Sequence, residues 1–227
     1  MYAISSPRKP GADDLEFVDE VYFSLLDEHS FALTVTGGIA SLGLAAAVLT
    51  DLIGDQFLHL DAAEGKLQAL GAADRCPRSA LAHTVWETIA AQHAVLAVSD
   101  WLRYWAADDF ATRAAERMVY RGLLTRSERR RRFSRDTVDY DPVDRTLAPW
   151  PLVRLRRRLT QPHQERPTSR DLHLYCILTA LDLTGRLGDA AHAVDTSRAH
   201  AALPQPLRTL FDQLRAAAGA AALTTGT

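Results

Sequence analysis

The feature that most limits the possible folds of this chain is a run of twenty residues, from 31 to 50, without a charged side chain. The run approaches the length that a helix needs to cross a bilayer. Three glycines, three threonines and Ser41 dilute it, and Asp51 and Asp55 follow it where a membrane anchor would carry cations. We therefore predict a buried central helix over residues 39–53, with an inner face formed by Leu42, Ala46, Leu49 and Ile53.

Helical periodicity predicts further amphipathic helices on both sides of the central one. A first helix has an apolar face from Leu15 to Leu25, and Asp13 or Asp14 can cap it. Later in the chain, Pro77 suits an early helical position, and Ser99 or Asp100 can cap another helix. The expected ranges after the central helix are residues 79–95, 101–109, 111–121, 145–159 and 169–184, with two more helices in the alanine-rich tail.

Short alternating segments predict small hairpins at the ends of these helices. Residues 31–35 alternate as in a short strand, residues 56–60 and 66–70 can pair across a turn, and residues 137–142 fit the second arm of another hairpin. We therefore predict a mainly α protein. It is a single globular domain with a buried central helix, surrounding amphipathic helices and two or three short β-hairpins. The expected domain spans residues 13–220, between a disordered lead-in (1–12) and a flexible tail (221–227).

The charge distribution favours an acidic partner, although the net charge of the whole chain is only −2. Residues 103–170 contain 17 basic and 9 acidic side chains, a net charge of +8, which leaves −10 on the rest of the chain. Such segregation steers a protein towards a polyanion. Both a membrane surface and a nucleic acid qualify.

Cysteine usage and the N-terminal sequence fit a cytoplasmic protein. Cys76 and Cys176 are a hundred residues apart and have no local partner, which suits neither a disulfide framework nor a zinc knuckle. Residues 1–14 lack the apolar centre of a signal peptide. We expect any contact with a membrane to be peripheral, at its inner face.

The most distinctive stretch is Ala111–Arg135, which predicts a helix, a glycine stop and an arginine-rich hairpin. Arginines repeat every four residues on the helix, opposite an apolar face, and Gly122 stands where a positive φ is needed. Leu123 and Leu124 then return the chain to the core. Guanidinium groups offer a planar fork of donors that suits phosphate. We therefore expect an anion-binding surface formed by Arg113, Arg117, Arg121, Arg126, Arg129, Arg130, Arg131, Arg132 and Arg135.

No catalytic or metal-binding pattern is recognisable in the sequence. Gly38 and Gly43 have the spacing of a phosphate-binding loop, but Leu44 and Ala45 stand where that loop needs Lys and Ser or Thr. The lone histidines lack further metal ligands at suitable spacing. Trp101 and Trp105 could stack on a base or dip into lipid, but core packing is the preferred interpretation. We predict no catalytic residue, no metal and no cofactor.

Four segments resemble, in order and approximate spacing, the Golgi phosphoprotein 3 family in its bacterial, mostly actinobacterial, branch. They are LEFVDEVYFSLLDEHSFAL, GLAAAVLTDLIGDQFLHL, WLRY followed by ERMVYRGLLTRSERRRRF, and RDLHLYCILTALDLTGRL. The resemblance implies a single helical domain without enzymatic activity that attaches to membranes through phosphatidylinositol 4-phosphate. Eukaryotic relatives also act as adaptors for glycosyltransferase tails and vesicle coats, partners that a bacterium lacks.

The resemblance also implies where a headgroup pocket would lie. Eukaryotic relatives use a tryptophan and three arginines, and the corresponding positions here are Thr36, Ala45, Asp108 and Ala111. The hairpin that is apolar in those relatives reads RRFSRDTVDYD in this chain. The function predicted from the sequence is thus a non-catalytic peripheral protein that binds phosphoinositide or another anionic membrane lipid. The alternatives are a winged-helix-like nucleic-acid-binding protein and a protein–protein adaptor.

Overall fold

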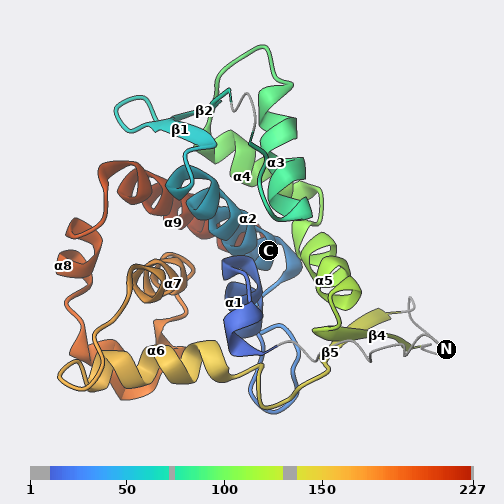
Figure 1. Cartoon of the computed structure of the whole chain (residues 1–227), viewed down its shortest axis with the longest axis vertical. Coiled ribbons are helices and arrows are strands. Elements are labelled where there is room, and N and C mark those ends of the chain that lie inside the picture. The colour runs from blue at the N-terminus through green and yellow to red at the C-terminus, as the bar shows by residue number, and fades with distance from the viewer. Residues whose placement is uncertain (1–10, 72–74, 130–136, 226–227) are drawn as a thin grey trace, which may run out of the picture.

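The structure of the chain is a computed structural model that describes residues 11–71, 75–129 and 137–225. It confirms a mainly α, single-domain protein with two small antiparallel sheets (Figure 1). The first half contains η1 (Ala12–Asp14), α1 (Phe17–Ser24), α2 (Gly37–Gly54), β1 (Leu58–Asp61), β2 (Lys66–Ala69), α3 (Ala80–Ala90), β3 (Leu96–Ala97) and α4 (Val98–Ala107). The second half contains α5 (Phe110–Tyr120), β4 (Leu124–Arg129), β5 (Thr137–Pro142), α6 (Trp150–Thr160), α7 (Ser169–Ala180), η2 (Thr184–Ala193), α8 (Thr196–Ala201) and α9 (Gln205–Thr225).

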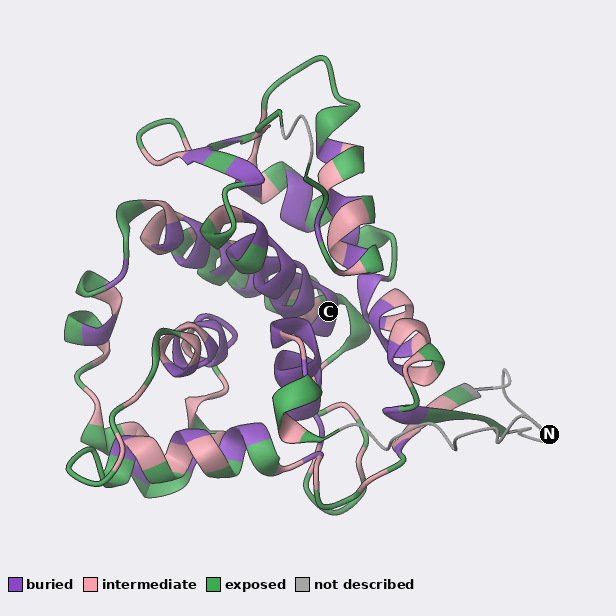
Figure 2. Ribbon diagram, viewed as in Figure 1, coloured by how far each residue is buried: buried purple, intermediate pink, exposed green. Residues whose placement is uncertain are grey.

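Helix α2 is the buried centre of the domain, as its uncharged sequence predicts. It packs against α1, α4, α5 and α9, and burial continues along nearly its whole length (Figures 1 and 2). It begins at Gly37, before the expected residue 39, because the Thr36 side chain accepts a hydrogen bond from the Ile39 amide. In the described part of the chain, one helix, α2, has the length and apolar composition that would allow it to span a membrane. Most of this helix is covered by protein. A core role explains its composition.

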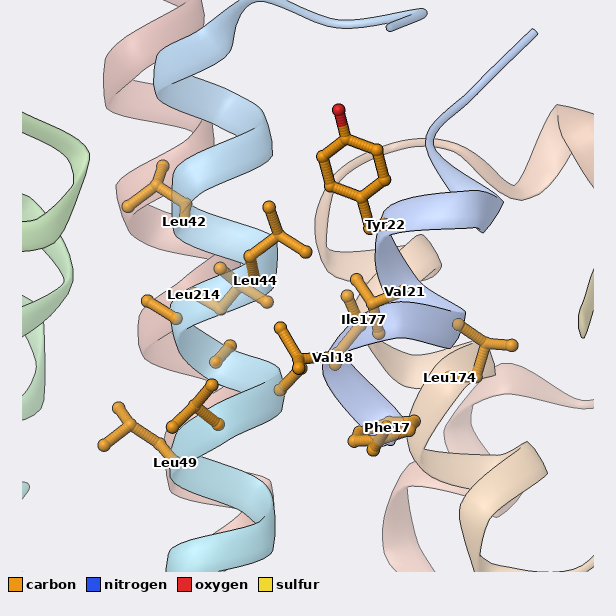
Figure 3. Packing of buried hydrophobic residues seen from close by; sticks show 14 of the residues in the cluster. Phe17, Val18, Val21, Tyr22, Leu42, Leu44, Leu49, Leu174, Ile177 and Leu214 are labelled. Atoms are coloured by element: carbon orange, nitrogen blue, oxygen red, sulfur yellow. The ribbon is translucent and has the colours of Figure 1, made fainter. Parts of the chain in front are cut away.

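Helix α1 is also covered on all sides, although it contains two acidic residues. Every residue from Phe17 to Ser24 is buried. Figure 3 shows Val18 and Val21 of α1 close to Leu44 of α2 and Ile177 of α7, in one buried cluster. The helix therefore joins the central helix to the C-terminal half of the domain, and its acidic residues must find partners inside the protein.

Gly43 allows α7 to approach α2 closely. A Cβ atom built on Gly43 would lie 2.7 Å from Cδ1 of Leu181 and 3.7 Å from Cγ2 of Ile177. Close helix packing, rather than phosphate binding, accounts for this glycine.

We expect Gly43→Val to lower the free energy of unfolding by about 1–3 kcal/mol, because its branched side chain overpacks this contact. Gly43→Ala should cost less, since the end of the Leu181 side chain can move and alanine favours a helix. Urea unfolding measures both. Gly219→Val is the control, because a Cβ atom at Gly219 meets no other atom within 4 Å. Equal stability of the two valine variants would contradict the close-packing explanation.

The region between residues 79 and 110 differs from its prediction in helix length. Helix α3 ends at Ala90 rather than at residue 95, because Leu96 and Ala97 pair with β2 and form a third strand. Trp101 and Trp105 are buried and stacked, with ring centroids 5.2 Å apart, as the core interpretation predicted. The pairing of β3 with β2 therefore ends the helix earlier than the helical periodicity of residues 91–95 predicts.

Residues 31–35 do not form the expected strand. Phe31 has a φ of 57°, and the segment contributes one isolated bridge, Leu26 to Leu33. The Asp27 carboxylate accepts hydrogen bonds from the amide and the hydroxyl of Ser30, which lower the pKa of Asp27 to about 2. This local turn replaces the ladder that the alternation suggested.

The bounds of the remaining strands lie closer to their predicted ranges than those of the remaining helices. Strands β1 and β2 pair antiparallel, and β5 matches the predicted residues 137–142. Helix α6 begins at Trp150 rather than at residue 145, and α7 ends at Ala180 rather than at residue 184. Helix α9 extends to Thr225, into the segment expected to be a tail.

Candidate functional site

Helix α5 and the strand that follows it have the local structure that their sequence predicts. The buried face of α5 includes Ala114, Ala115 and Met118. After the helix, Gly122 has a φ of 73°, a left-handed conformation that glycine adopts without a steric penalty. Leu123 and Leu124 are buried next to it. This arrangement directs the arginines of α5 away from the α2 side of the helix.

Two of these arginines bind carboxylates of α1. Arg117 Nη1 donates to Asp19 Oδ1 at 2.6 Å, and Arg117 also pairs with Glu16. Arg121 contacts the same two residues, at 3.2 Å for Glu16 Oε1, and donates to the backbone oxygen of Asp14 at 2.6 Å. Arg117 and Arg121 therefore neutralise buried acids of their own chain.

Burial of the α1 acids explains why these pairs form. Asp19 is completely buried, and its carboxylate also accepts the Glu16 amide at 2.9 Å to cap the helix. A buried carboxylate without a partner costs several kcal/mol, so cations from other helices must approach it. Burial alone would raise the pKa of Glu16, but the hydrogen bond and charge of Arg117 lower it below its usual value.

A second group of ion pairs lies on the side of α1 that meets α6 and α7. Arg154 holds both oxygens of Glu20 at 2.8 Å and donates to Asp171 Oδ1 at 3.0 Å. Arg158 donates to Asp171 Oδ2 at 2.7 Å, and Arg170 contacts Glu20 Oε2 at 3.1 Å. Glu20 and Asp171 are 2% and 0% exposed. Sequence reasoning missed this network, whose signal was three acids, Glu16, Asp19 and Glu20, within the otherwise apolar segment LEFVDEVYF.

Arg113 and Arg126 are more accessible than Arg117 and Arg121. Arg113 pairs with Asp108 at 2.5 Å, and 39% of its side chain is exposed. Arg126 lies 3.4 Å from Glu116 and 3.3 Å from Glu128, and 45% of its side chain is exposed. Such exposed pairs are weak and exchange readily with other partners. These two arginines can contact an external anion at small cost.

The other predicted arginines are Arg129, the last residue of β4, and four that stand between β4 and β5 in the sequence. Strands β4 and β5 pair from Leu124–Pro142 to Arg129–Thr137. The described residues of β4 beyond Leu124 are exposed, and the hairpin lies at the edge of the molecule, away from the central helices (Figures 1 and 2). The side chain of Arg129, together with Arg130, Arg131, Arg132 and Arg135, lies outside the described residues.

Of the four positions that the family resemblance assigns to a headgroup pocket, Thr36 precedes α2, Ala45 lies in the middle of α2, and Asp108 and Ala111 flank the start of α5. The starts of α2 and α5 meet where the Ala111 amide donates to Ser41 Oγ at 2.9 Å. Thr36 caps α2, and Asp108 pairs with Arg113. Ala45 and Ala111 are buried, at 1% and 4% exposed. None of these four residues offers a cation to a ligand.

Comparison with known families agrees with the order of these elements. A family model described as Golgi phosphoprotein 3 (GPP34) matches residues 17–224, from the first residue of α1 to the penultimate residue of α9. The chain belongs to the Golgi phosphoprotein 3 (GPP34) family. The match includes Asp19 and Glu20, the two buried acids of α1, with the arginines that pair with them, and the arginine-rich hairpin. A search of curated proteins gave no match.

Proposed function

We propose that this GPP34-family protein is a non-catalytic peripheral protein that binds anionic lipid at the inner face of a membrane. The arginine-rich sequence 126–135, which begins within β4, would provide the contact. The observation that carries the proposal is the contrast between the two sets of arginines. Those that face α1 are matched by buried acids, whereas β4 is exposed from Thr125 to Glu128, and the sequence from Arg129 to Arg135 contains five arginines, at positions 129–132 and 135.

The proposed contact is electrostatic rather than specific for one headgroup. Each arginine near an acidic leaflet contributes about 1 kcal/mol, so the hairpin alone would give substantial binding. Family resemblance implies phosphatidylinositol 4-phosphate as the lipid. However, Thr36, Ala45, Asp108 and Ala111 provide no guanidinium at the corresponding pocket, and Asp108 would repel a phosphate. We therefore propose that the eukaryotic pocket residues are not retained and that surface charge governs binding.

Flotation with vesicles tests the charge dependence. The full chain should float with vesicles of phosphatidylcholine and phosphatidylserine at low salt, and not with phosphatidylcholine alone. Vesicles in which phosphatidylinositol 4-phosphate supplies the same charge should bind it equally. Raising the salt concentration should weaken binding, because the contact is screened. Equal recovery on neutral and anionic vesicles would refute the proposal.

The R130Q/R131Q/R132Q variant should bind anionic vesicles about 100-fold more weakly, since three contacts of about 1 kcal/mol are removed. The matched control is R78Q/R198Q/R215Q, which removes the same charge from three exposed arginines elsewhere. The control should float like the wild-type protein. Equal weakening by both variants would show that net charge, and not the hairpin, determines binding.

The nucleic-acid alternative loses its main support in the structure. A winged helix would present α5 to a groove, but Arg117 and Arg121 of α5 face α1 and are engaged there. A mobility-shift assay with duplex DNA at low salt separates the alternatives. Binding to DNA that is lost in R130Q/R131Q/R132Q, without any vesicle binding, would favour nucleic acid over lipid. Co-purification from the native organism would identify a protein partner if the adaptor alternative holds.

A further inference from the structure

One face of α6 presents large apolar side chains to the solvent. The face of α6 that packs in the core is formed by Pro151, Leu152, Leu155 and Leu159. Trp150 and Val153 lie outside this face and are 39% and 43% exposed. Their spacing of three residues makes them neighbours on the helix surface, and Arg157, four residues later, continues the same line. Figure 1 shows α6 at the outer edge of the domain, where this line is accessible to a partner.

Trp150 differs from the other tryptophans of the chain. Trp101 and Trp105 are buried and stacked on each other, and Trp86 packs edge-on against Phe57. The Trp150 ring is partly exposed, and it forms neither a ring contact nor a hydrogen bond with any residue that the structure describes. An amphipathic ring in this situation suits the boundary between water and lipid, where one part of the ring is in an apolar layer and the N–H is hydrated.

The charge of the same segment is positive. Residues 145–164 contain five arginines and neither an aspartate nor a glutamate. Three of these arginines are already paired with acids of other segments, namely Arg154, Arg156 and Arg158. Arg157 is 58% exposed, and its nearest acid, Glu165, is 3.8 Å away. So loose and exposed a pair is weak, which leaves Arg157 available to a lipid phosphate.

A compact turn joins α6 to the base of the β4–β5 hairpin. At the base, the Val143 amide donates to the Leu123 oxygen at 3.0 Å, and 44% of Val143 is exposed. The Asp144 carboxylate closes the turn by accepting hydrogen bonds from the amide and the hydroxyl of Thr146, at 2.9 and 2.7 Å. Helix α6 then begins at Trp150. The exposed face of α6 therefore starts close to the hairpin to which we assign lipid binding.

We propose that the outer face of α6, formed by Trp150, Val153 and Arg157, is a second contact with the same anionic membrane. The indole ring and the valine enter the layer between the headgroups and the acyl chains, while the Arg157 guanidinium binds a lipid phosphate. This inference rests on the proposed function and adds an apolar contact to a purely electrostatic one. Two contacts also fix the orientation of the domain on the membrane, which a single hairpin would leave free to rotate.

Fluorescence quenching tests whether Trp150 reaches lipid. The full chain is mixed at low salt with vesicles of phosphatidylcholine and phosphatidylserine, with or without bromine on the acyl chains near the headgroup. We expect the brominated vesicles to quench part of the tryptophan emission. The Trp150→Phe variant should still float with the vesicles but lose this quenching, because Trp101 and Trp105 are buried in the core.

A pair of double variants measures the contribution of the apolar contact. W150A/V153A should partition about tenfold more weakly into these vesicles, because two partly exposed apolar side chains no longer leave water on binding. V95A/L223A is the control, since Val95 and Leu223 are 48% and 79% exposed on other segments. It should bind as the wild-type protein does, and circular dichroism checks that both variants fold. Equal binding by the two double variants would overturn the proposal.

The outcomes separate this inference from the proposed function. If the chain floats with anionic vesicles but Trp150→Phe does not reduce the quenching, the α6 contact is wrong and charge-driven binding stands. If the chain does not float with anionic vesicles at all, both proposals fail. Sedimentation velocity without vesicles tests another occupant of the same face. A dimer that dissociates in W150A/V153A would assign the face to a second copy of the chain and overturn the lipid contact.

Discussion

Replacement of Arg154 by alanine is expected to lower the free energy of unfolding by about 3–5 kcal/mol. Arg154 is only 15% exposed, and it bridges Glu20 of α1 to Asp171 of α7 through three hydrogen bonds of 2.8–3.0 Å. Its removal leaves two buried carboxylates with fewer cations. The hydrogen bonds to Glu20 and the charges of Glu20 and Asp171 raise the pKa of Arg154 above its usual value, although burial opposes this shift.

Thermal unfolding followed by circular dichroism measures this effect. A loss of this size corresponds to a fall in Tm of about 6–20 °C for a domain of this length. Arg103→Ala is the matched control, because the Arg103 side chain is 70% exposed and pairs with Asp100 on the surface. It should leave the Tm nearly unchanged. A Tm for Arg154→Ala equal to that of the control would show that the α1 network contributes little to stability.

A double variant separates the ion pair from the packing of the Arg154 side chain. Glu20→Gln combined with Arg154→Gln removes both charges, so its loss of stability should be smaller than the sum of the two single losses. Exact additivity would mean that the two side chains act independently, in spite of their contact.

The second large effect is expected from Ala45→Arg, which places a guanidinium at a position where the family resemblance implies an arginine in the eukaryotic relatives. Ala45 is 1% exposed within α2, so the new side chain would be both oversized and charged in the core. We expect the free energy of unfolding to fall by on the order of 5 kcal/mol, enough to unfold a marginal protein. Soluble yield and urea unfolding measure this outcome.

Ala216→Arg provides the comparison, because Ala216 is an exposed residue of α9 and tolerates a charged side chain. The Ala45 variant also tests the interpretation of the headgroup pocket. If it folded with an unchanged Tm and bound inositol phosphate more tightly than the wild-type protein, the position would open to a pocket after all. Unfolding of Ala45→Arg alone supports a pocket closed by core packing.

Some features of the structure could be predicted from the sequence, whereas others depend on contacts between distant segments. The buried α2 could be predicted because a long uncharged run rich in leucine, alanine and valine is more stable in a core than in water. The position of Gly122 and the second arm of the β4–β5 hairpin were also predictable, since positive φ and strand alternation are local properties. The prediction that a helix reaches residue 95 was wrong for a non-local reason, because β3 pairs with β2.

The arginines illustrate the same division most clearly. Sequence alone determined how many there are, their spacing and the positive charge of residues 103–170. Only the tertiary structure decided that Arg117 is bound to Asp19, a residue 98 positions away, while Arg126 remains accessible. An ion pair depends on which helices lie side by side, and that arrangement follows from burial of the whole apolar surface. A count of charges along the chain therefore indicates the sign of the charge on a partner. It does not show which side chains remain available to bind that partner.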